Sequence, residues 1–297
     1  MLFTVLLILL GAGAVCVAYG VVVERRWYRV VRRRLDILPA TGPEPLTVLH
    51  LSDLHFVRGD AAKARFLAGL PPADVTVVTG DFLAEPEAVA TAVEAVRPVR
   101  GRLTSWFVLG SNDYFVPRLL NPLRYLLPRR RHRIGVRGPW RELEAALEGD
   151  GWEHLRNVRM EASLDGSPIE LLGLDDAHLG WHDLRVALRE SPDRFGVVVA
   201  HSPDPAPELA ALGYDLVIAG HTHGGQVRLP FLGALVTNSH LPRRLVSGLF
   251  RLPPAWVHVS RGVGTGKYAP FRFLCRPEAT FLELRRQPER ARSNTAS

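Results

Sequence analysis

The sequence predicts an α/β fold, because short apolar runs alternate with helix-like segments along most of its 297 residues. Strands are expected where the runs are β-prone, at residues 46–51, 74–79, 106–109, 169–172, 195–200 and 214–219. Helices are expected between several of them, at residues 61–70, 85–96, 140–147 and 184–190. Strands that alternate with helices are typical of sheets covered by helices. The hydrophobic content of 47% also excludes a disordered or low-complexity chain.

The N-terminus has the pattern of a membrane anchor. Residues 1–23 carry no charged side chain, and a helix of this length is about 34 Å long, enough to cross a bilayer core of about 30 Å. Trp27, Tyr28 and several arginines follow, as is typical of the membrane interface. We expect one uncleaved transmembrane helix in the cell membrane, with the following domain on the cytoplasmic side. A cleaved signal peptide is the alternative, although no basic residue precedes the apolar run.

The rest of the chain divides into three parts by composition. Residues 24–45 are expected to form a basic juxtamembrane segment and a proline-rich linker. Residues 46–284 contain all the strand and helix patterns and are expected to form one catalytic domain. Residues 285–297 are polar and are expected to be a disordered tail.

Charge and cysteine content argue against a nucleic-acid binder and against a protein built on disulfides or cysteine-bound zinc. The net charge of +7 comes from two arginine clusters, at residues 24–34 and 118–137, and the remainder of the chain is net acidic. Nucleic-acid binders usually carry their charge across one reading face, so a nucleic-acid partner is not expected. The two cysteines, Cys16 and Cys275, are too few for a disulfide framework or a cysteine-rich zinc module.

Residues that can bind metals follow the expected strands, each at the point where the strand ends. They are Asp53 with His55, Asp81, Asn112 with Asp113, His201, and His221 with His223. Ligands of open α/β sheets collect at the carboxyl ends of strands, so these five loops are expected to converge on one site.

Taken singly, these residues have ordinary alternatives. Asp81 follows a glycine and is also suited to a turn or a helix cap, and a histidine such as His201 after a core strand is often structural. The segment 220–226 is more specific, because its two histidines stand among three glycines that leave the imidazoles accessible. Together, the residues predict two divalent ions, manganese, iron or zinc, with Asp81 as the bridging ligand. Such a site activates a water between the ions to hydrolyse a phosphate ester.

The motif order Asp-x-His, Gly-Asp, Gly-Ser-Asn-Asp, His, Gly-His-x-His resembles the calcineurin-like metallophosphoesterase superfamily. The segment 220–226 is most similar to its membrane-associated bacterial branch, which residues 173–176 and 270–272 also fit. The resemblance covers residues 46 to 284 and implies a four-layer α/β/β/α sandwich of two mixed sheets. It assigns Asp53, His55 and His223 to the first metal, His201 and His221 to the second, and Asp81 to both.

One motif departs from the family pattern. The family has Gly-Asn-His followed by an acid, and this chain has Gly-Ser111-Asn112-Asp113. Aligned without a gap, Ser111 takes the position of the ligand asparagine; shifted by one, Asn112 keeps it, and we prefer Asn112 because an amide oxygen suits these ions better than a hydroxyl. The family histidine that assists the leaving group is absent, with Asn112 or Asp113 nearest and His132 supported only by its proximity in sequence. Losing a general acid typically costs about 10²–10⁴-fold in rate.

Two further segments carry weaker signals. Residues 262–267 resemble a phosphate loop, but the glycine spacing differs, and a turn at the rim of the site is predicted. His178 and His182 lie near two aspartates, and a polar loop is the preferred interpretation.

The arginine-rich segment 118–137 has two interpretations. It can be a solvated face, or a flap that contacts anionic lipid headgroups and brings a lipid-borne phosphate to the metals.

The sequence therefore predicts a membrane-anchored, metal-dependent phosphoesterase that cleaves a phosphate mono- or diester with a metal-activated hydroxide. A metal-binding pseudoenzyme or scaffold at the membrane, with little turnover, is the alternative that the altered motif leaves open. A nuclease is disfavoured by the anchor.

Overall fold

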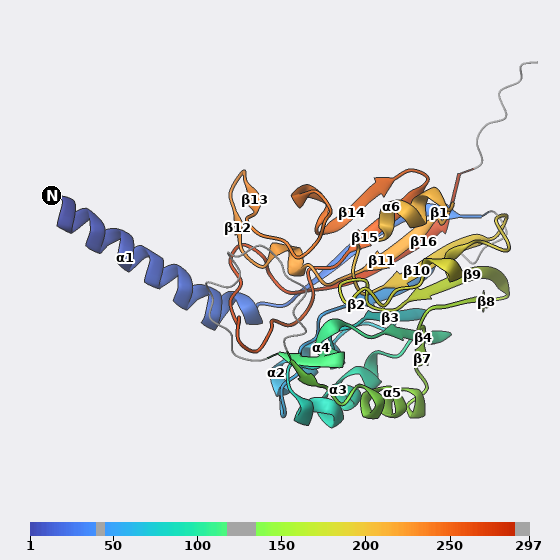
Figure 1. Ribbon diagram of the computed structural model, residues 1–297, viewed down its shortest axis with the longest axis horizontal. Coiled ribbons are helices and arrows are strands. Elements are labelled where there is room, and N and C mark those ends of the chain that lie inside the picture. The colour runs from blue at the N-terminus through green and yellow to red at the C-terminus, as the bar shows by residue number, and fades with distance from the viewer. Residues whose placement is uncertain (40–44, 118–134, 289–297) are drawn as a thin grey trace, which may run out of the picture.

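The computed structural model describes residues 1–39, 45–117 and 135–288. Two six-stranded mixed sheets face each other, and helices cover their outer faces (Figure 1). Three apolar cores separate the four layers: one between the sheets, one under the helices of the first sheet, and one under those of the second. The predicted α/β/β/α sandwich is confirmed.

The first sheet has the strand order β1-β16-β2-β3-β4-β7. Its strands are β1 (Arg29–Leu38), β16 (Glu278–Arg286), β2 (Leu46–Leu51), β3 (Val75–Thr79), β4 (Thr104–Val108) and β7 (Glu153–His154). Because β2, β3 and β4 run parallel, their carboxyl ends meet at one edge of the sheet.

The second sheet has the order β14-β15-β11-β10-β9-β8. Its strands are β14 (Gly248–Leu252), β15 (Ala255–Val259), β11 (Leu216–Ala219), β10 (Phe195–Ala200), β9 (Ser167–Leu174) and β8 (Val158–Leu164). Here β9, β10, β11 and β15 run parallel. Two small hairpins complete the strands: β5 (Phe115–Pro117) with β6 (Gly135–Arg137), and β12 (Arg228–Leu229) with β13 (Gly233–Ala234).

The helices of the globular body are α2 (Ala61–Ala68), α3 (Val89–Val96), α4 (Ser111–Tyr114), α5 (Trp140–Gly149) and α6 (Ala206–Ala211). Short 3₁₀ turns are η3 (Pro86–Ala88), η4 (Arg97–Val99), η6 (Leu184–Ala187), η7 (His223–Gly225) and η8 (Arg243–Leu245). The helix expected at 184–190 is thus a single turn. It ends at Ala187 because Leu188 has an extended backbone, and the carboxylate of Glu170 accepts hydrogen bonds from the backbone N–H groups of Glu190 and Ser191 that follow.

The N-terminal helix α1 (Leu2–Ala18) continues through the π-helical turn η1 (Tyr19–Val23) and the 3₁₀ turn η2 (Glu24–Arg26), and it projects away from the body (Figure 1). The segment Phe3–Arg26 is long and apolar enough to cross a membrane. Its end is part of the fold, since Gly20 and Glu24 are buried.

The structure places an edge strand in the segment expected to be juxtamembrane. Strand β1 pairs in parallel with β16 along the first sheet. Its later residues Leu35, Ile37 and Leu38 are buried between the sheets, while its arginines lie toward solvent. Parts of the expected linker, basic segment and tail, namely residues 40–44, 118–134 with His132, and 289–297, lie outside the described residues.

Candidate metal centre

The predicted site residues converge where the strands of both sheets end. Asp53 and His55 follow β2, Asp81 follows β3, and Asn112 follows β4 in the first sheet. His201 follows β10, and His221 and His223 follow β11 in the second sheet. Left-handed backbone, uncommon outside glycine and concentrated at functional sites, occurs at five of these positions. The five are Asp53, His55, Asp81, His221 and His223.

A first cluster consists of Asp53, His55 and His223, whose ligand atoms all lie within 4.8 Å of one another. The Nε2 atoms of the two histidines are 3.1 Å apart, and Nε2 of His223 is 3.3 Å from Oδ1 of Asp53. The other oxygen of Asp53 accepts hydrogen bonds from Oγ of Ser52 at 2.5 Å and the backbone N–H of His221 at 3.0 Å. Oδ1 of Asp53 is buried without a hydrogen-bond partner and faces the cluster.

A second cluster consists of Asp53, Asp81 and His201. Nδ1 of His201 lies 2.6 Å from the carbonyl oxygen of Thr79 and donates to it, so Nε2 is the nitrogen that faces the cluster. Nε2 of His201 is 3.2 Å from Nδ1 of His221 and 3.6 Å from Oδ1 of Asp81. Burial lowers the pKa of His201, but the carboxylates of Asp81, Asp176 and Asp53 outweigh it and raise the pKa to about 9.

Asp81, a member of the second cluster, also lies beside His55 of the first. Its Oδ2 is 3.6 Å from Nε2 of His55, and its Oδ1 is 3.6 Å from Nε2 of His201. Burial raises the pKa of Asp81, but the two imidazoles and hydrogen bonds from Asn112 lower it more strongly, which keeps the carboxylate charged. Gly110 makes room for this carboxylate, since a Cβ there would lie 2.2 Å from Oδ1 of Asp81.

The sequence matches a known protein family over the part of the chain that carries most of these residues. The sequence model of the family "Calcineurin-like phosphoesterase" matches residues 46–225, from β2 to the turn that carries His223. This chain belongs to the calcineurin-like phosphoesterase family. The predicted superfamily and enzyme class are therefore confirmed.

Three relatives of this phosphoesterase cover most of its length. The uncharacterized metallophosphoesterase YkuE of Bacillus subtilis is 30% identical over 242 residues, 80% of this chain and 76% of YkuE. The phosphodiesterase YaeI of Escherichia coli is 26% identical over 267 residues, 88% of this chain and 90% of YaeI. The UDP-2,3-diacylglucosamine pyrophosphatase LpxG of Chlamydia trachomatis is 27% identical over 282 residues, 82% of this chain and 84% of LpxG.

In the altered motif of this phosphoesterase, the side chains of Asn112 and Asp113 contact different groups. Asn112 faces Asp81 and donates to it from both backbone and side chain. Asp113 is fully buried and accepts hydrogen bonds from the backbone N–H groups of Gly110 and Leu83, each at 3.0 Å. Burial, together with the charge of Asp81, raises the pKa of Asp113 to about 8. The Asp113 carboxyl thus holds the backbone of the loop by hydrogen bonds and is not part of the cluster.

The two histidines after β11 are held in the neutral form that binds metals. Burial lowers the pKa of His223 to about 4 and that of His221 well below 6.5. Repulsion from neighbouring imidazoles and from Arg272 adds to this effect. The ring of His178 lies 4.6 Å from that of His221, so this histidine belongs to the rim of the site. The sequence predicts a polar loop at this histidine.

Sequence reasoning missed the roles of Ser52 and Arg272. Arg272 is completely buried, and its Nη2 lies 3.4 Å from Nδ1 of His223 and donates to the carbonyl oxygens of Arg261 and Gly264. Residues 270–272 had stood out only through the family resemblance. Ser52 carried no signal, since a serine before an aspartate is common.

The expected rim turn lies directly behind Asp53. The backbone N–H of Gly264 donates to the Asp53 carbonyl oxygen at 2.7 Å, and that of Val263 donates to Ser52. A Cβ at Gly262 would lie 2.7 Å from Cβ of Asp53. The turn therefore fixes the backbone from which the Asp53 side chain enters the site.

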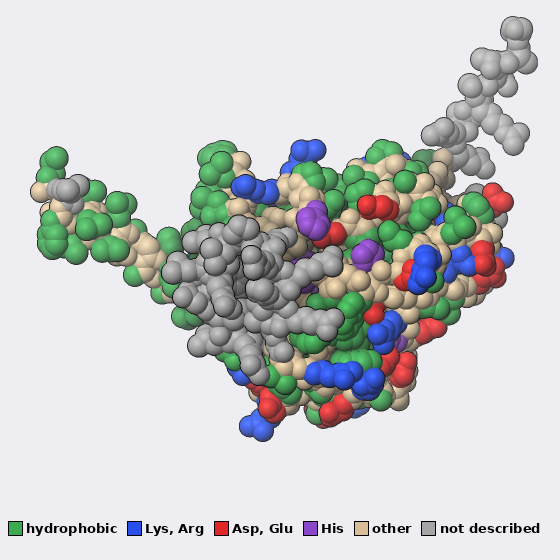
Figure 2. All heavy atoms as spheres, in the orientation of Figure 1, with side chains coloured by type: hydrophobic (Ala, Val, Ile, Leu, Met, Phe, Trp, Pro, Cys, Tyr) green, Lys and Arg blue, Asp and Glu red, His purple; other side chains and the backbone are tan. Residues whose placement is uncertain are grey.

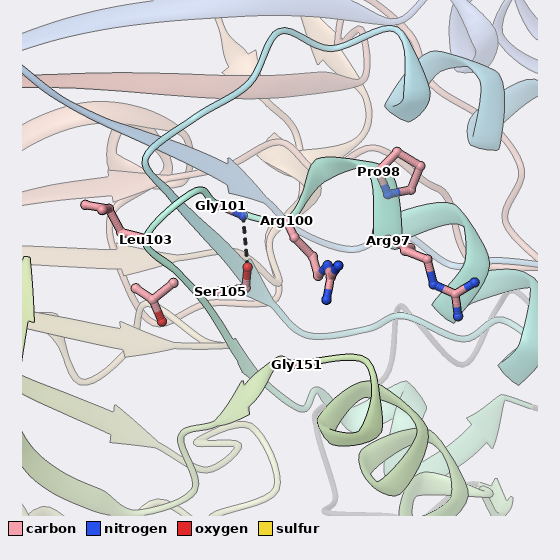
Figure 3. A pocket seen from close by; sticks show the side chains of 8 residues that line it. Arg97, Pro98, Arg100, Gly101, Leu103, Ser105 and Gly151 are labelled. Atoms are coloured by element: carbon pink, nitrogen blue, oxygen red, sulfur yellow. Dashed lines mark hydrogen bonds between the residues drawn. The ribbon is translucent and has the colours of Figure 1, made fainter.

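A separate surface hollow lies far from this chemistry (Figure 3). Its lining residues are Arg97, Pro98, Arg100, Gly101, Leu103, Thr104, Ser105 and Gly151. Thr104 begins β4, whereas Asn112 follows the end of that strand, so the hollow is at the opposite edge of the first sheet. Arg97 donates a hydrogen bond to the Asp150 carboxylate and Arg100 donates one to the Asp150 carbonyl oxygen, so both guanidinium groups already have partners.

Proposed function

We propose that this chain is a membrane-anchored phosphoesterase that uses two divalent ions, manganese, iron or zinc, to hydrolyse a phosphate mono- or diester. One observation carries the proposal: the two oxygens of Asp81 face two different groups of imidazoles, one containing His55 and the other containing His201. This is the arrangement that a carboxylate shared by two cations requires.

The donor set fits such ions. Buried polar atoms rarely remain unpaired, yet Oδ1 of Asp53 does, and two imidazole nitrogens face each other at 3.1 Å beside it. Borderline metals accept this mixture of nitrogen and oxygen ligands. We assign Asp53, His55 and His223 to one ion, Asn112, His201 and His221 to the other, and Asp81 to both. When bound, the ions would lower the pKa of a nucleophilic water and offset charge on the phosphoryl group.

The protein's own residues would orient the ligands. Thr79 sets the tautomer of His201 through its carbonyl oxygen, and Ser52 holds the second oxygen of Asp53. Asn112 donates a hydrogen bond to each oxygen of Asp81. Such outer contacts typically contribute about 10–100-fold to metal affinity or activity.

The membrane anchor is supported by the apolar segment Phe3–Arg26 and by the residues at its end. Trp27 is half-exposed and stacks under the guanidinium of Arg276 at 3.9 Å, as suits the headgroup region. The arginines after the helix favour a cytoplasmic active site. A lipid-borne phosphoester is supported by the name of one relative, the UDP-2,3-diacylglucosamine pyrophosphatase LpxG.

The experiment uses the full chain in detergent, because a chain starting at Pro45 would lack β1 and expose the edge of β16. The protein is stripped of metal, reloaded with manganese, and assayed on a phosphomonoester and a phosphodiester that carry activated leaving groups. We expect metal-dependent turnover that Asp81→Asn and His221→Ala abolish. His240→Ala is the matched control, because this histidine is 84% exposed and lies on the surface.

The metal content of each variant is measured in parallel. Two bound ions without turnover of either ester would overturn the enzymatic proposal and leave a metal-binding scaffold. Turnover that persists in Asp81→Asn would overturn the proposal that Asp81 is shared by two ions.

A further inference from the structure

The hairpin of β12 and β13 ends in an unusually exposed apolar tip. Phe231 is fully exposed and Leu232 is 72% exposed, and Val236 follows at 65%. Figure 2 shows hydrophobic side chains gathered over this hairpin, with basic side chains beside them. Soluble surfaces rarely place several large apolar side chains together without a partner. We call Phe231 and Leu232 the apolar tip.

The apolar tip and the N-terminal helix are attached to the same segment of chain. The backbone N–H of Arg228, in β12, donates to the carbonyl oxygen of Phe273 at 2.9 Å, and the N–H of Phe273 donates to Gln226. The ring of Phe273 packs edge-on against Tyr19, at the end of the helix, with centroids 6.3 Å apart. Both α1 and the hairpin project from the same end of the body (Figure 1).

The end of the helix is held in a fixed direction. A Cβ at Gly20 would lie 2.5 Å from the carbonyl oxygen of Arg272, so the helix backbone and this segment are in direct contact. The carboxylate of Glu24 is buried and accepts hydrogen bonds from the backbone N–H groups of Leu274 and Cys275. The helix therefore does not swing freely relative to the hairpin.

The hairpin also borders the metal centre. A Cβ at Gly225, in the turn that carries His223, would lie 2.4 Å from Cβ of Ala234 in β13. Beyond the hairpin, the carbonyl oxygen of Asn238 is 3.3 Å from Nε2 of His221. The C-terminal side of the hairpin thus contacts both the turn that carries His223 and the ring of His221.

The surroundings of the hairpin carry positive charge. Arg243 and Arg244 are exposed in η8, which packs beside β13. Apolar side chains flanked by arginines suit an anionic lipid surface, where the rings and chains enter the acyl region and the guanidinium groups bind headgroups.

We propose that the apolar tip enters the leaflet that surrounds the C-terminal end of the N-terminal helix and thereby presents the metal centre to phosphoesters carried by membrane lipids. The occupant of this surface is the bilayer, because the hairpin is bonded to Phe273, which packs against the end of the one segment among the described residues that is long and apolar enough to span a bilayer. The choice of substrate rests on the proposed function, whereas the insertion of the tip does not.

The insertion is tested with the full chain in vesicles of phosphatidylcholine and phosphatidylglycerol. A Leu232→Cys variant in a Cys16→Ser background carries an environment-sensitive fluorophore, and brominated lipids serve as quenchers. Leu188→Cys is the matched control, because Leu188 is similarly exposed, at 66%, and follows η6, where its carbonyl oxygen accepts a hydrogen bond from Arg159 of the edge strand β8. We expect a blue shift and quenching at position 232 and neither at position 188.

Equal, water-like emission at both positions would overturn the insertion. A blue shift at position 232 that brominated lipids do not quench, and that grows with the protein-to-lipid ratio, would also overturn it and assign the tip to a second copy of this chain.

The substrate class is tested by the ratio of turnover on a vesicle-borne phosphoester to turnover on a soluble one. Replacing both tip residues, Phe231→Ser with Leu232→Ser, is expected to lower this ratio about tenfold, which corresponds to roughly 1.4 kcal/mol. The control pair Leu103→Ser with Leu188→Ser is expected to keep the ratio. An unchanged ratio in the tip variant would overturn the lipid-borne substrate. No turnover of either ester by the unaltered chain, with quenching intact, would instead overturn the proposed function alone.

Discussion

Asn112 and Asp81 are joined by two hydrogen bonds, and these connect the loop after β4 to the carboxylate whose two oxygens face His55 and His201. The backbone N–H of Asn112 donates to Oδ1 of Asp81 at 2.8 Å, and its side-chain amide donates to Oδ2. This geometry supports Asn112, rather than Ser111, at the position of the family's ligand asparagine.

Replacing Asn112 by alanine is expected to lower manganese affinity or kcat/KM about 10–100-fold, because Asp81 loses a donor and the second ion loses its expected amide ligand. Ser111→Ala is the matched control for the competing alignment and is expected to change either quantity by no more than about twofold. Steady-state assays at several manganese concentrations separate metal affinity from kcat. A larger loss for Ser111→Ala than for Asn112→Ala would establish the ungapped alignment instead.

The location of the site was predictable because it depends on local features of the sequence. A parallel strand ends, a polar residue follows, and parallel strands align their ends at one edge. Asp53, Asp81 and His201 could therefore be recognised one strand at a time. Their ligand roles stay predictions, but their proximity needs only the sheet geometry.

The structural features that sequence reasoning missed depend on contacts between distant residues. Strand β1 was concealed because Arg32, Arg33 and Arg34 interrupt its apolar pattern, and its partner β16 lies about 250 residues away in sequence. The direction of the Asp113 side chain depends on two backbone N–H groups, one of them at Leu83, which follows another strand. Neither pairing leaves a periodic signal in the sequence.

Gly20 and Gly13 provide a matched pair for the fixed helix end. A Cβ at Gly20 would lie 2.2 Å from the Phe271 ring and 2.5 Å from a backbone oxygen, whereas a Cβ at Gly13 meets nothing within 4 Å. Gly20→Ala is therefore expected to destabilise the full chain by about 1–3 kcal/mol. This loss would be measured as a lower melting temperature in detergent. Gly13→Ala is expected to be neutral or slightly stabilising, since the added methyl meets nothing and alanine favours a helix. Equal melting temperatures would show that the helix end is not packed as the structure has it.

Two buried histidines outside the metal centre make stability depend on pH. Nδ1 of His50 lies 2.8 Å from Nδ1 of His258, and Nε2 of His50 is bonded to Oγ1 of Thr79. Burial lowers the pKa of His258 to about 4, with Glu278 raising it and Arg33 lowering it further. Burial, and then repulsion from His258, hold the pKa of His50 well below 6.5.

In the unfolded chain these imidazoles have a pKa of about 6.5, so below that pH the unfolded state binds more protons than the folded state. The contribution of these two imidazoles to stability is therefore expected to be constant above about pH 7 and to fall between about pH 6.5 and 4, by up to about 1.4 kcal/mol per pH unit for each imidazole. His258→Gln keeps a hydrogen-bonding partner for His50 but does not titrate, so its melting temperature is expected to fall less steeply from pH 7.5 to 5. The histidines of the metal centre contribute equally to both proteins, and the exposed His240→Gln is expected to parallel the unaltered chain. Parallel curves for His258→Gln and the unaltered chain would show that folding does not lower the pKa of His258, so that its imidazole is protonated equally in both states.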